Sequence, residues 1–130
     1  MATIFSKIIA GEIPCHKIAE TKKFFAFLDI NPVAKGHTLV IPKKEEDNLF
    51  NLDEETYIGL MIFSKYLARA IGDAVPCIKV GMSVIGLEVP HAHLHLVPLN
   101  QMEDINFSKE KLKPSQDELA ETAAAIRAKL

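Results

Sequence analysis

Three of the chain's five histidines stand at alternate positions of one short stretch, VPHAHLHLVPL: they are His91, His93 and His95. Alternate residues of a β-strand point to the same side of a sheet, so this spacing predicts one face that carries three imidazoles. Imidazole titrates near neutral pH; it is a nucleophile when neutral and a hydrogen-bond donor to phosphate oxygens when charged. The residues between the histidines would then face the core: Ala92, Leu94 and Leu96.

Three interpretations of the histidine face are open. The histidines could be polar residues on a solvated sheet surface, although Thr, Lys or Glu would serve equally well there and the repeat is strict. They could bind a metal, but the outer two Cα atoms of such a row lie about 13 Å apart, so a tetrahedral zinc ion accommodates a neighbouring pair more easily than all three. Phosphate chemistry, with one histidine as nucleophile and its neighbours as donors, fits the extended row best.

Composition places these histidines in a small globular protein. The 130 residues fit a single domain, 1–130, and 48% of them are hydrophobic, which is enough to form a core. The net charge is −2 and no long run of Lys or Arg occurs, so we expect no nucleic-acid partner. No apolar run approaches about 18 residues, so we expect no membrane partner. The two cysteines form no C-x-x-C pair, and we expect a cytoplasmic protein without a disulfide framework.

Apolar periodicity and turn residues predict a mixed fold. A short helix is expected in 3–14, and a C-terminal helix in the 113–130 extension, where Ser115 and Glu118 have capping-box spacing. Five segments have the composition of strands: 16–21, 23–30, 37–43, 77–85 and 91–98, the last closed by Pro98.

The main helix is predicted over residues 54–71, from an N-cap at Asp53 to a stop at Gly72. On a helical wheel Lys65 and Arg69 share one narrow sector, and apolar side chains spread around most of the remainder. One sheet covers only one side of such a helix. We therefore expect a second copy of the chain to cover another side, which makes the protein a homodimer.

The stretch HAHLHLV matches the H-φ-H-φ-H-φ-φ signature of the histidine triad superfamily. The similarity extends through IFSKIIAGEIP, FAFLDINPVAKGHTLVIPK and GLEVPHAHLHLVP, over residues 3–100. The chain resembles the small nucleotide hydrolases that act on nucleoside 5'-phosphoramidates. This resemblance implies an α+β fold with a five-stranded antiparallel sheet, a main helix and terminal helices, paired across a two-fold axis into a ten-stranded dimer sheet. It also implies a purine nucleotide substrate, no cofactor, and a covalent nucleotidyl-histidine intermediate that water releases.

The same resemblance assigns site residues. His93 matches the nucleophile that attacks the α-phosphate, and His91 and His95 match the flanking members that bind phosphate oxygens and orient the nucleophile. Asp29 matches the carboxylate that binds the ribose hydroxyls. His37 also fits the family pattern, and we assign it a structural role between loop and strand. Five positions match the surroundings of the base, although each is equally readable as core: Phe5, Ile8, Ile13, Phe27 and Ile30.

Two departures from the family pattern bear on function. The zinc ligands of many bacterial members are replaced by Thr3, Ser6 and Glu45, so we expect no metal site. The polar pair that precedes the triad in the phosphoramidase branch is replaced by Leu87 and Glu88, which leaves recognition of the leaving group open. Glu88 is either a solvated rim residue or a general acid that protonates the leaving group.

The sequence therefore predicts a hydrolase of purine nucleoside 5'-phosphoramidates or related nucleotidyl conjugates. Two alternatives stay open. One is a hydrolase of dinucleoside polyphosphates. The other is a non-catalytic nucleotide-binding or regulatory module, in which the altered loop has abolished turnover.

Overall fold

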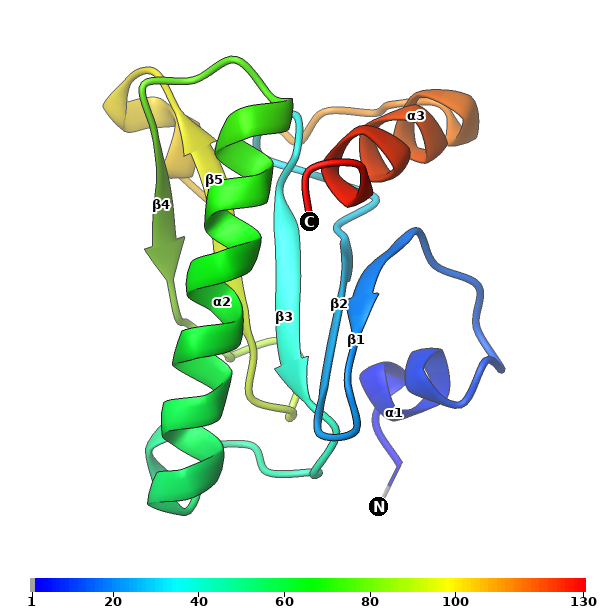
Figure 1. The fold of residues 1–130 in the computed structure, drawn as a ribbon, viewed down its shortest axis with the longest axis vertical. Coiled ribbons are helices and arrows are strands. Elements are labelled where there is room, and N and C mark those ends of the chain that lie inside the picture. Colours follow the sequence, from blue (N-terminus) through cyan, green and yellow to red (C-terminus); the bar gives the residue numbers. More distant parts are fainter. Residues whose placement is uncertain (1) are drawn as a thin grey trace.

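The computed structural model describes residues 2–130, in which five antiparallel strands form one sheet with helices on both faces (Figure 1). The strand order is β1-β2-β3-β5-β4. The strands are β1 Lys17–Glu20, β2 Phe24–Leu28, β3 Thr38–Pro42, β4 Lys79–Ser83 and β5 Leu94–Leu99. The helices are α1 Ile4–Ile9, α2 Glu54–Ala74 and α3 Gln116–Arg127, with single 3₁₀ turns at Leu49–Asn51 and Met102–Ile105. The predicted α+β class is confirmed.

Each of the three helices begins at a residue whose side chain caps its first turn. The Thr3 side chain accepts a hydrogen bond from the main-chain N–H of Ser6 at 3.0 Å, and this bond caps α1. Asp53 caps α2 through the N–H of Thr56 at 3.1 Å, as predicted. At α3, Ser115 forms the predicted capping box with its partner three residues later.

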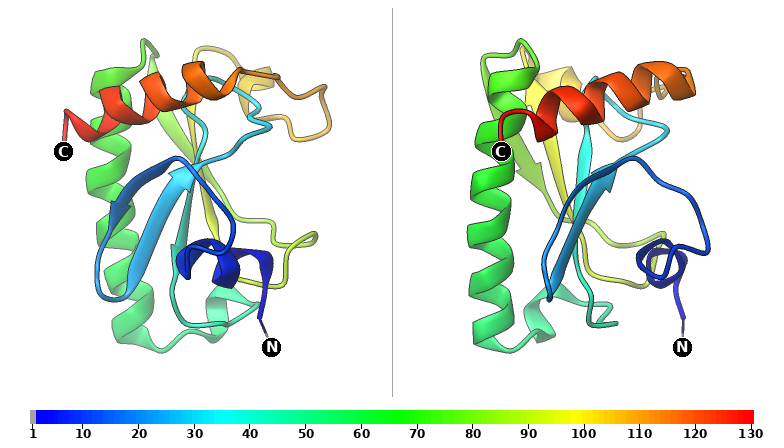
Figure 2. Two further views of the ribbon diagram at one scale, coloured as in Figure 1. Left: turned by 90° about the vertical axis from the view of Figure 1, so that its right-hand side faces the viewer. Right: turned by 45° about the vertical axis from the view of Figure 1, so that its right-hand side comes forward.

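The sheet separates two buried clusters, and Figure 2 shows α1 on the opposite side of the sheet from α2. Buried residues of α3 belong to the same cluster as those of α2. We call the side under α2 and α3 the packed face. Its strand residues are Phe24, Ala26, Leu28, Val40, Leu94 and Leu96, and Ala92 joins the same cluster. The side under α1 is called the cavity face, and it holds Phe25, Phe27, Leu39 and Ile41, with Phe5 and Ile8 of α1. Ala92, Leu94 and Leu96 thus lie in the core as the alternation predicted.

Strand β5 differs from its predicted bounds at both ends. It begins at Leu94, because β3 ends at Pro42, which has no N–H to continue the ladder. The preceding N–H of Ala92 instead donates to the carbonyl of Glu46 at 2.6 Å. Pro98 does not close the strand but pairs with Val80. The proline fits there because β3 pairs β5 only as far as Leu96, so no neighbouring strand needs a donor on that side.

Helix α2 runs past its predicted end at Gly72. It continues to Ala74, and the N–H of Val75 closes the last turn on the carbonyl of Ile71 at 2.9 Å. Pro76 follows, and a residue that precedes proline is disfavoured in the helical conformation, so the stop belongs to Pro76. A Cβ at position 72 would lie 3.7 Å from the side chain of Val80, which shows close packing of the helix on β4.

One side of α2 faces outward without cover. Ile58, Ile62 and Tyr66 lie one turn apart along it and are each more than half exposed. The expected homodimer would cover this row, and it stays a prediction. Within residues 2–130, no helix combines the length and the apolar content that a bilayer crossing requires.

Candidate functional site

A cavity of about 520 Å³ opens on the cavity face, between α1, the end of β2, the loop before the histidines and the segment that follows β5. His93 and His95 line it, together with Asp29 and Glu88. The predicted apolar site residues line it as well: Phe5, Ile8, Ile13, Phe27 and Ile30. Of all the predicted site residues, only His91 lies outside the lining.

His93 presents an unprotonated nitrogen to the cavity. Its Nδ1 lies 2.7 Å from the main-chain carbonyl of His91; a carbonyl only accepts, so Nδ1 carries the proton and Nε2 keeps its lone pair. The edge of the Phe5 ring packs against the imidazole, with the ring centroids 5.0 Å apart. Burial lowers the pKa of His93 below its ordinary value, against the opposing effect of the carbonyl hydrogen bond. His93 is therefore neutral at neutral pH, with the lone pair of Nε2 available.

His95 presents the opposite group. The N–H of Val33 donates to Nδ1 of His37 at 3.1 Å, so His37 keeps its own proton on Nε2 and donates it to Nδ1 of His95 at 2.9 Å. His95 must then carry its proton on Nε2, as a hydrogen-bond donor. Burial and the neighbouring imidazoles lower the pKa of His95 to about 4 and that of His37 to about 3. Both rings are neutral at neutral pH, and the Nε2–H of His95 is a donor without the ring being charged.

His91 is placed differently from the expectation that it binds phosphate oxygens. It is fully buried, and both ring nitrogens are used within the protein. Nε2 donates to the carbonyl of Pro42 at 2.7 Å, so Nδ1 accepts from the hydroxyl of Thr3 at 2.8 Å. No ring atom is left for a ligand. The contribution of His91 to the site is its main-chain carbonyl, which orients His93.

Asp29 follows β2 and holds a carboxylate at the cavity wall. One oxygen accepts the N–H of Asn31 at 2.8 Å, and the other lies 3.8 Å from Nε2 of His37. Burial raises the pKa of Asp29, and the Asn31 hydrogen bond and the charge of Lys111 oppose that rise. The less engaged oxygen is an acceptor for a ligand hydroxyl.

Asp29, His37 and His95 place ligand-type atoms within 4.8 Å of one another, but the trio does not fit a metal ion. His37 Nδ1 accepts the Val33 amide, so its Nε2 must stay protonated, and a protonated nitrogen cannot be a metal ligand. At the positions of the family's zinc ligands, Thr3 and Ser6 share a hydrogen bond of 3.1 Å while Glu45 is exposed. The absence of a metal stays a prediction.

Phe107 and Lys111 are among the lining residues that the sequence analysis did not assign to the site. Both line the cavity from the irregular segment after β5. The Phe107 ring lies against His95, with centroids 4.7 Å apart, and against His37 at 5.7 Å. This segment has no periodic pattern, so nothing in the sequence placed it near the histidines.

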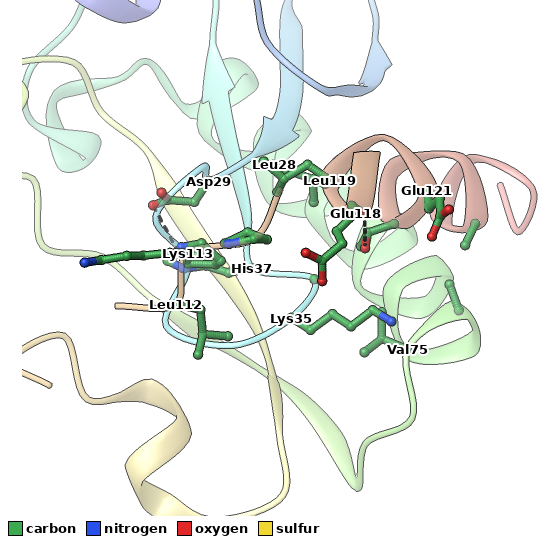
Figure 3. Close-up of a pocket in the computed structure, with 16 residues that line it drawn as sticks. Leu28, Asp29, Lys35, His37, Val75, Leu112, Lys113, Glu118, Leu119 and Glu121 are labelled. Carbon is green, nitrogen blue, oxygen red and sulfur yellow. Dashed lines mark hydrogen bonds and ion pairs between the residues drawn. The ribbon is translucent and has the colours of Figure 1, made fainter. Parts of the chain in front are cut away.

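A second cavity of about 550 Å³ adjoins the first and shares Leu28, Asp29 and His37 with it. Figure 3 shows it between the loop that carries Asp29 and His37 and the helix α3, with Lys35 and Glu118 extending along its wall. The C-terminal extension therefore forms the wall of the second cavity that faces the loop with Asp29 and His37.

Comparisons with known proteins agree with this fold. The sequence profile of the HIT domain matches residues 10–102. The adenosine 5'-monophosphoramidase of Saccharomyces cerevisiae is 42% identical over 98 residues, which are 75% of this chain and 62% of that protein. That of Schizosaccharomyces pombe is 38% identical over 75% of this chain and 74% of the relative. The crystal structure of a Hit-like protein from Bartonella henselae superposes with a TM-score of 0.85 and 32% identity, covering 98% of this chain and 96% of that one.

Proposed function

The chain belongs to the HIT domain family, and from that premise we propose that it hydrolyses purine nucleoside 5'-phosphoramidates or related nucleotidyl conjugates to a nucleoside 5'-monophosphate. The observation that carries the proposal is the pair of opposed imidazoles, a free lone pair on His93 beside a fixed N–H donor on His95. One attacks phosphorus while the other binds a phosphate oxygen. The two relatives named adenosine 5'-monophosphoramidase support cleavage of a P–N bond.

The reaction proceeds in two displacements. Nε2 of His93 forms a bond to the α-phosphorus, the bond from phosphorus to the leaving amine breaks, and the departing nitrogen takes a proton from Glu88 or from solvent water. The imidazole becomes cationic, and its Nδ1–H, held on the His91 carbonyl, is stabilised by that dipole. His95 donates to the oxygen on which negative charge develops. Water then displaces His93 from phosphorus and releases the nucleoside monophosphate and the free enzyme.

The remaining walls suit a nucleoside. Asp29 offers its less engaged oxygen to the ribose hydroxyls. Phe5, Ile8 and Phe27 form apolar surface for a base, and they are buried enough to be rigid. The half-exposed Ile30 closes the rim of this surface. Glu88 stands on the exposed loop at the mouth, within the lining, where an amine would leave.

The test is AMP release from adenosine 5'-phosphoramidate and, in parallel, from a diadenosine polyphosphate. Release from the first substrate alone, with a nucleotidylated protein seen by intact mass in rapidly quenched samples, supports the proposal. Release from the second alone would identify a dinucleoside polyphosphate hydrolase. Binding of AMP without turnover of either substrate would identify a nucleotide-binding module.

A further inference from the structure

The substrate cavity lacks the positive charge that an anionic ligand needs, except at one residue. Asp29 and Glu88 bring acidic groups to the lining, and His37, His93 and His95 are neutral at neutral pH because burial lowers their pKa values. Among the described lining residues, Lys111 is the only lysine or arginine. A phosphate bound between the histidines without it would meet carboxylates and uncompensated desolvation.

Lys111 is held at the cavity wall. The N–H of Leu112 donates to the carbonyl of Pro32 at 2.9 Å, and this bond ties the segment to the loop after Asp29. Four residues before Lys111, Phe107 packs on the imidazoles of His95 and His37. The segment that carries Lys111 therefore has anchors both before and after it, and one of them lies against the ring of His95.

The ammonium of Lys111 is not neutralised by the protein. It donates to the main-chain carbonyls of Phe107 and Lys109, the second at 3.3 Å, and within residues 2–130 no ion pair joins it to a carboxylate. Its charge reaches the site: burial dominates the pKa values of Asp29 and His37, and the charge of Lys111 lowers both. A phosphate oxygen would be a stronger partner for this half-buried ammonium than a neutral carbonyl.

We propose that Lys111 binds the phosphate of the substrate and makes the cavity select nucleotides over uncharged nucleosides. The inference rests on the proposed function for the identity of the ligand. Lys111 lies beyond residues 10–102, where the family profile matches, so the assignment comes from the position of the segment after β5 in this chain.

The experiment measures binding of AMP and of adenosine by calorimetry at low ionic strength. Lys111→Gln keeps a donor for the two carbonyls but removes the charge, so it should weaken AMP binding by about ten- to a hundredfold, the range of a charged hydrogen bond, and leave adenosine binding unchanged. Lys111→Arg should retain the preference for AMP. Lys113→Gln is the matched control: it removes the same charge two residues away, from the lining of the second cavity, and should not alter AMP binding.

The outcomes separate this inference from the proposed function. Equal AMP affinity in wild type and Lys111→Gln would overturn the role of Lys111. Equal losses for AMP and adenosine would overturn it too, because they would show a structural role for the segment. A wild-type protein that prefers AMP through Lys111 yet cleaves no phosphoramidate would support the inference and overturn the hydrolase proposal alone.

Discussion

The two faces of the sheet are covered unequally. On the packed face, α2 contributes 21 residues and α3 a further 12, and the side chains beneath them are aliphatic and aromatic. On the cavity face, α1 has only 6 residues and leaves open the space where the histidines lie. The stabilising free energy of hydrophobic burial is roughly proportional to the apolar area removed from water. The packed face therefore supplies most of the stability. The short cover is what makes room for a ligand.

The two faces differ most clearly along β5 and the residues just before it. Leu94 is fully buried in the packed-face cluster, while its neighbours His93 and His95 line the cavity. The alternation of a strand thus assigns stability and chemistry to adjacent residues. Substitutions at neighbouring positions should therefore affect different properties.

The largest effect is expected at His93. His93→Ala removes the nucleophile and should lower kcat by about 10⁴-fold or more, while AMP still binds through its other contacts. Single-turnover kinetics and calorimetry measure the two quantities. His16→Ala is the matched control, because His16 is hydrogen-bonded to Gln116 and lies outside the cavity lining. Turnover at the wild-type rate in the His93 variant would remove it as the nucleophile.

Glu88 tests whether the rim of the cavity face takes part in chemistry. If it protonates the leaving amine, Glu88→Gln should slow cleavage of phosphoramidates with strongly basic amines by about 10²- to 10⁴-fold. Substrates whose leaving group is already a stable anion should react at the wild-type rate. Equal rates for both substrate kinds would leave Glu88 as a solvated rim residue.

A pair of truncations, one on each face, should separate stability from binding. Leu94→Ala leaves a cavity in the packed face and should cost about 2–5 kcal/mol of unfolding free energy. Ile30→Ala is at a position 54% exposed at the rim, and should change stability by less than about 0.5 kcal/mol while raising KM. Urea titrations and steady-state kinetics give the two values. Comparable stability losses would contradict the division between the faces.

The outer side of α2 tests whether the packed layer extends into a second copy of the chain. We expect a dimer at micromolar concentration, and Ile62→Glu should weaken self-association by about ten- to a hundredfold because it places a charge in an apolar contact. Sedimentation measures the dissociation constant. Lys65→Ala, on the polar sector of the same helix, should leave it unchanged. A monomeric wild type would contradict the expectation.

The smallest effect is expected from mild acid. His93 must be neutral to attack, and burial lowers its pKa, so the neutral form persists below the ordinary histidine value of about 6.5. The acid limb of kcat/KM should therefore fall below that pH, and the rate should change little from pH 8 to 7. An inflection at or above 6.5 would show that the imidazole is not desolvated in the free enzyme.

Much of the fold could be predicted because its signals are local. The caps at Asp53 and Ser115 depend on a few consecutive residues, and the β1–β2 hairpin depends on its turn. The alternation around Leu94 placed the core correctly for the same reason. The error at Gly72 arose because the local stop signal is Pro76, four residues later, and the error at Pro98 arose because β3 stops short of it, which is a tertiary condition.

The site was less predictable where hydrogen bonds join distant segments. Its apolar walls followed from the resemblance. The engagement of both ring nitrogens of His91 did not, because it depends on Thr3 and Pro42, which lie far away in the sequence. The link from His37 to His95 has the same character, and Lys111 reaches the cavity through a segment without regular structure. Such contacts leave no periodic trace in a sequence.

The fixed tautomers of His93 and His95 mean that two identical side chains have been made chemically unlike by their surroundings. The difference originates in main-chain groups: the carbonyl of His91 acts on His93 directly, and the amide of Val33 acts on His95 through the side chain of His37. Reversing the two tautomers would therefore require a different arrangement of main-chain groups around the two histidines. The path of the backbone sets the difference between the two imidazoles. Side-chain substitutions at this site can abolish that difference but cannot reverse it.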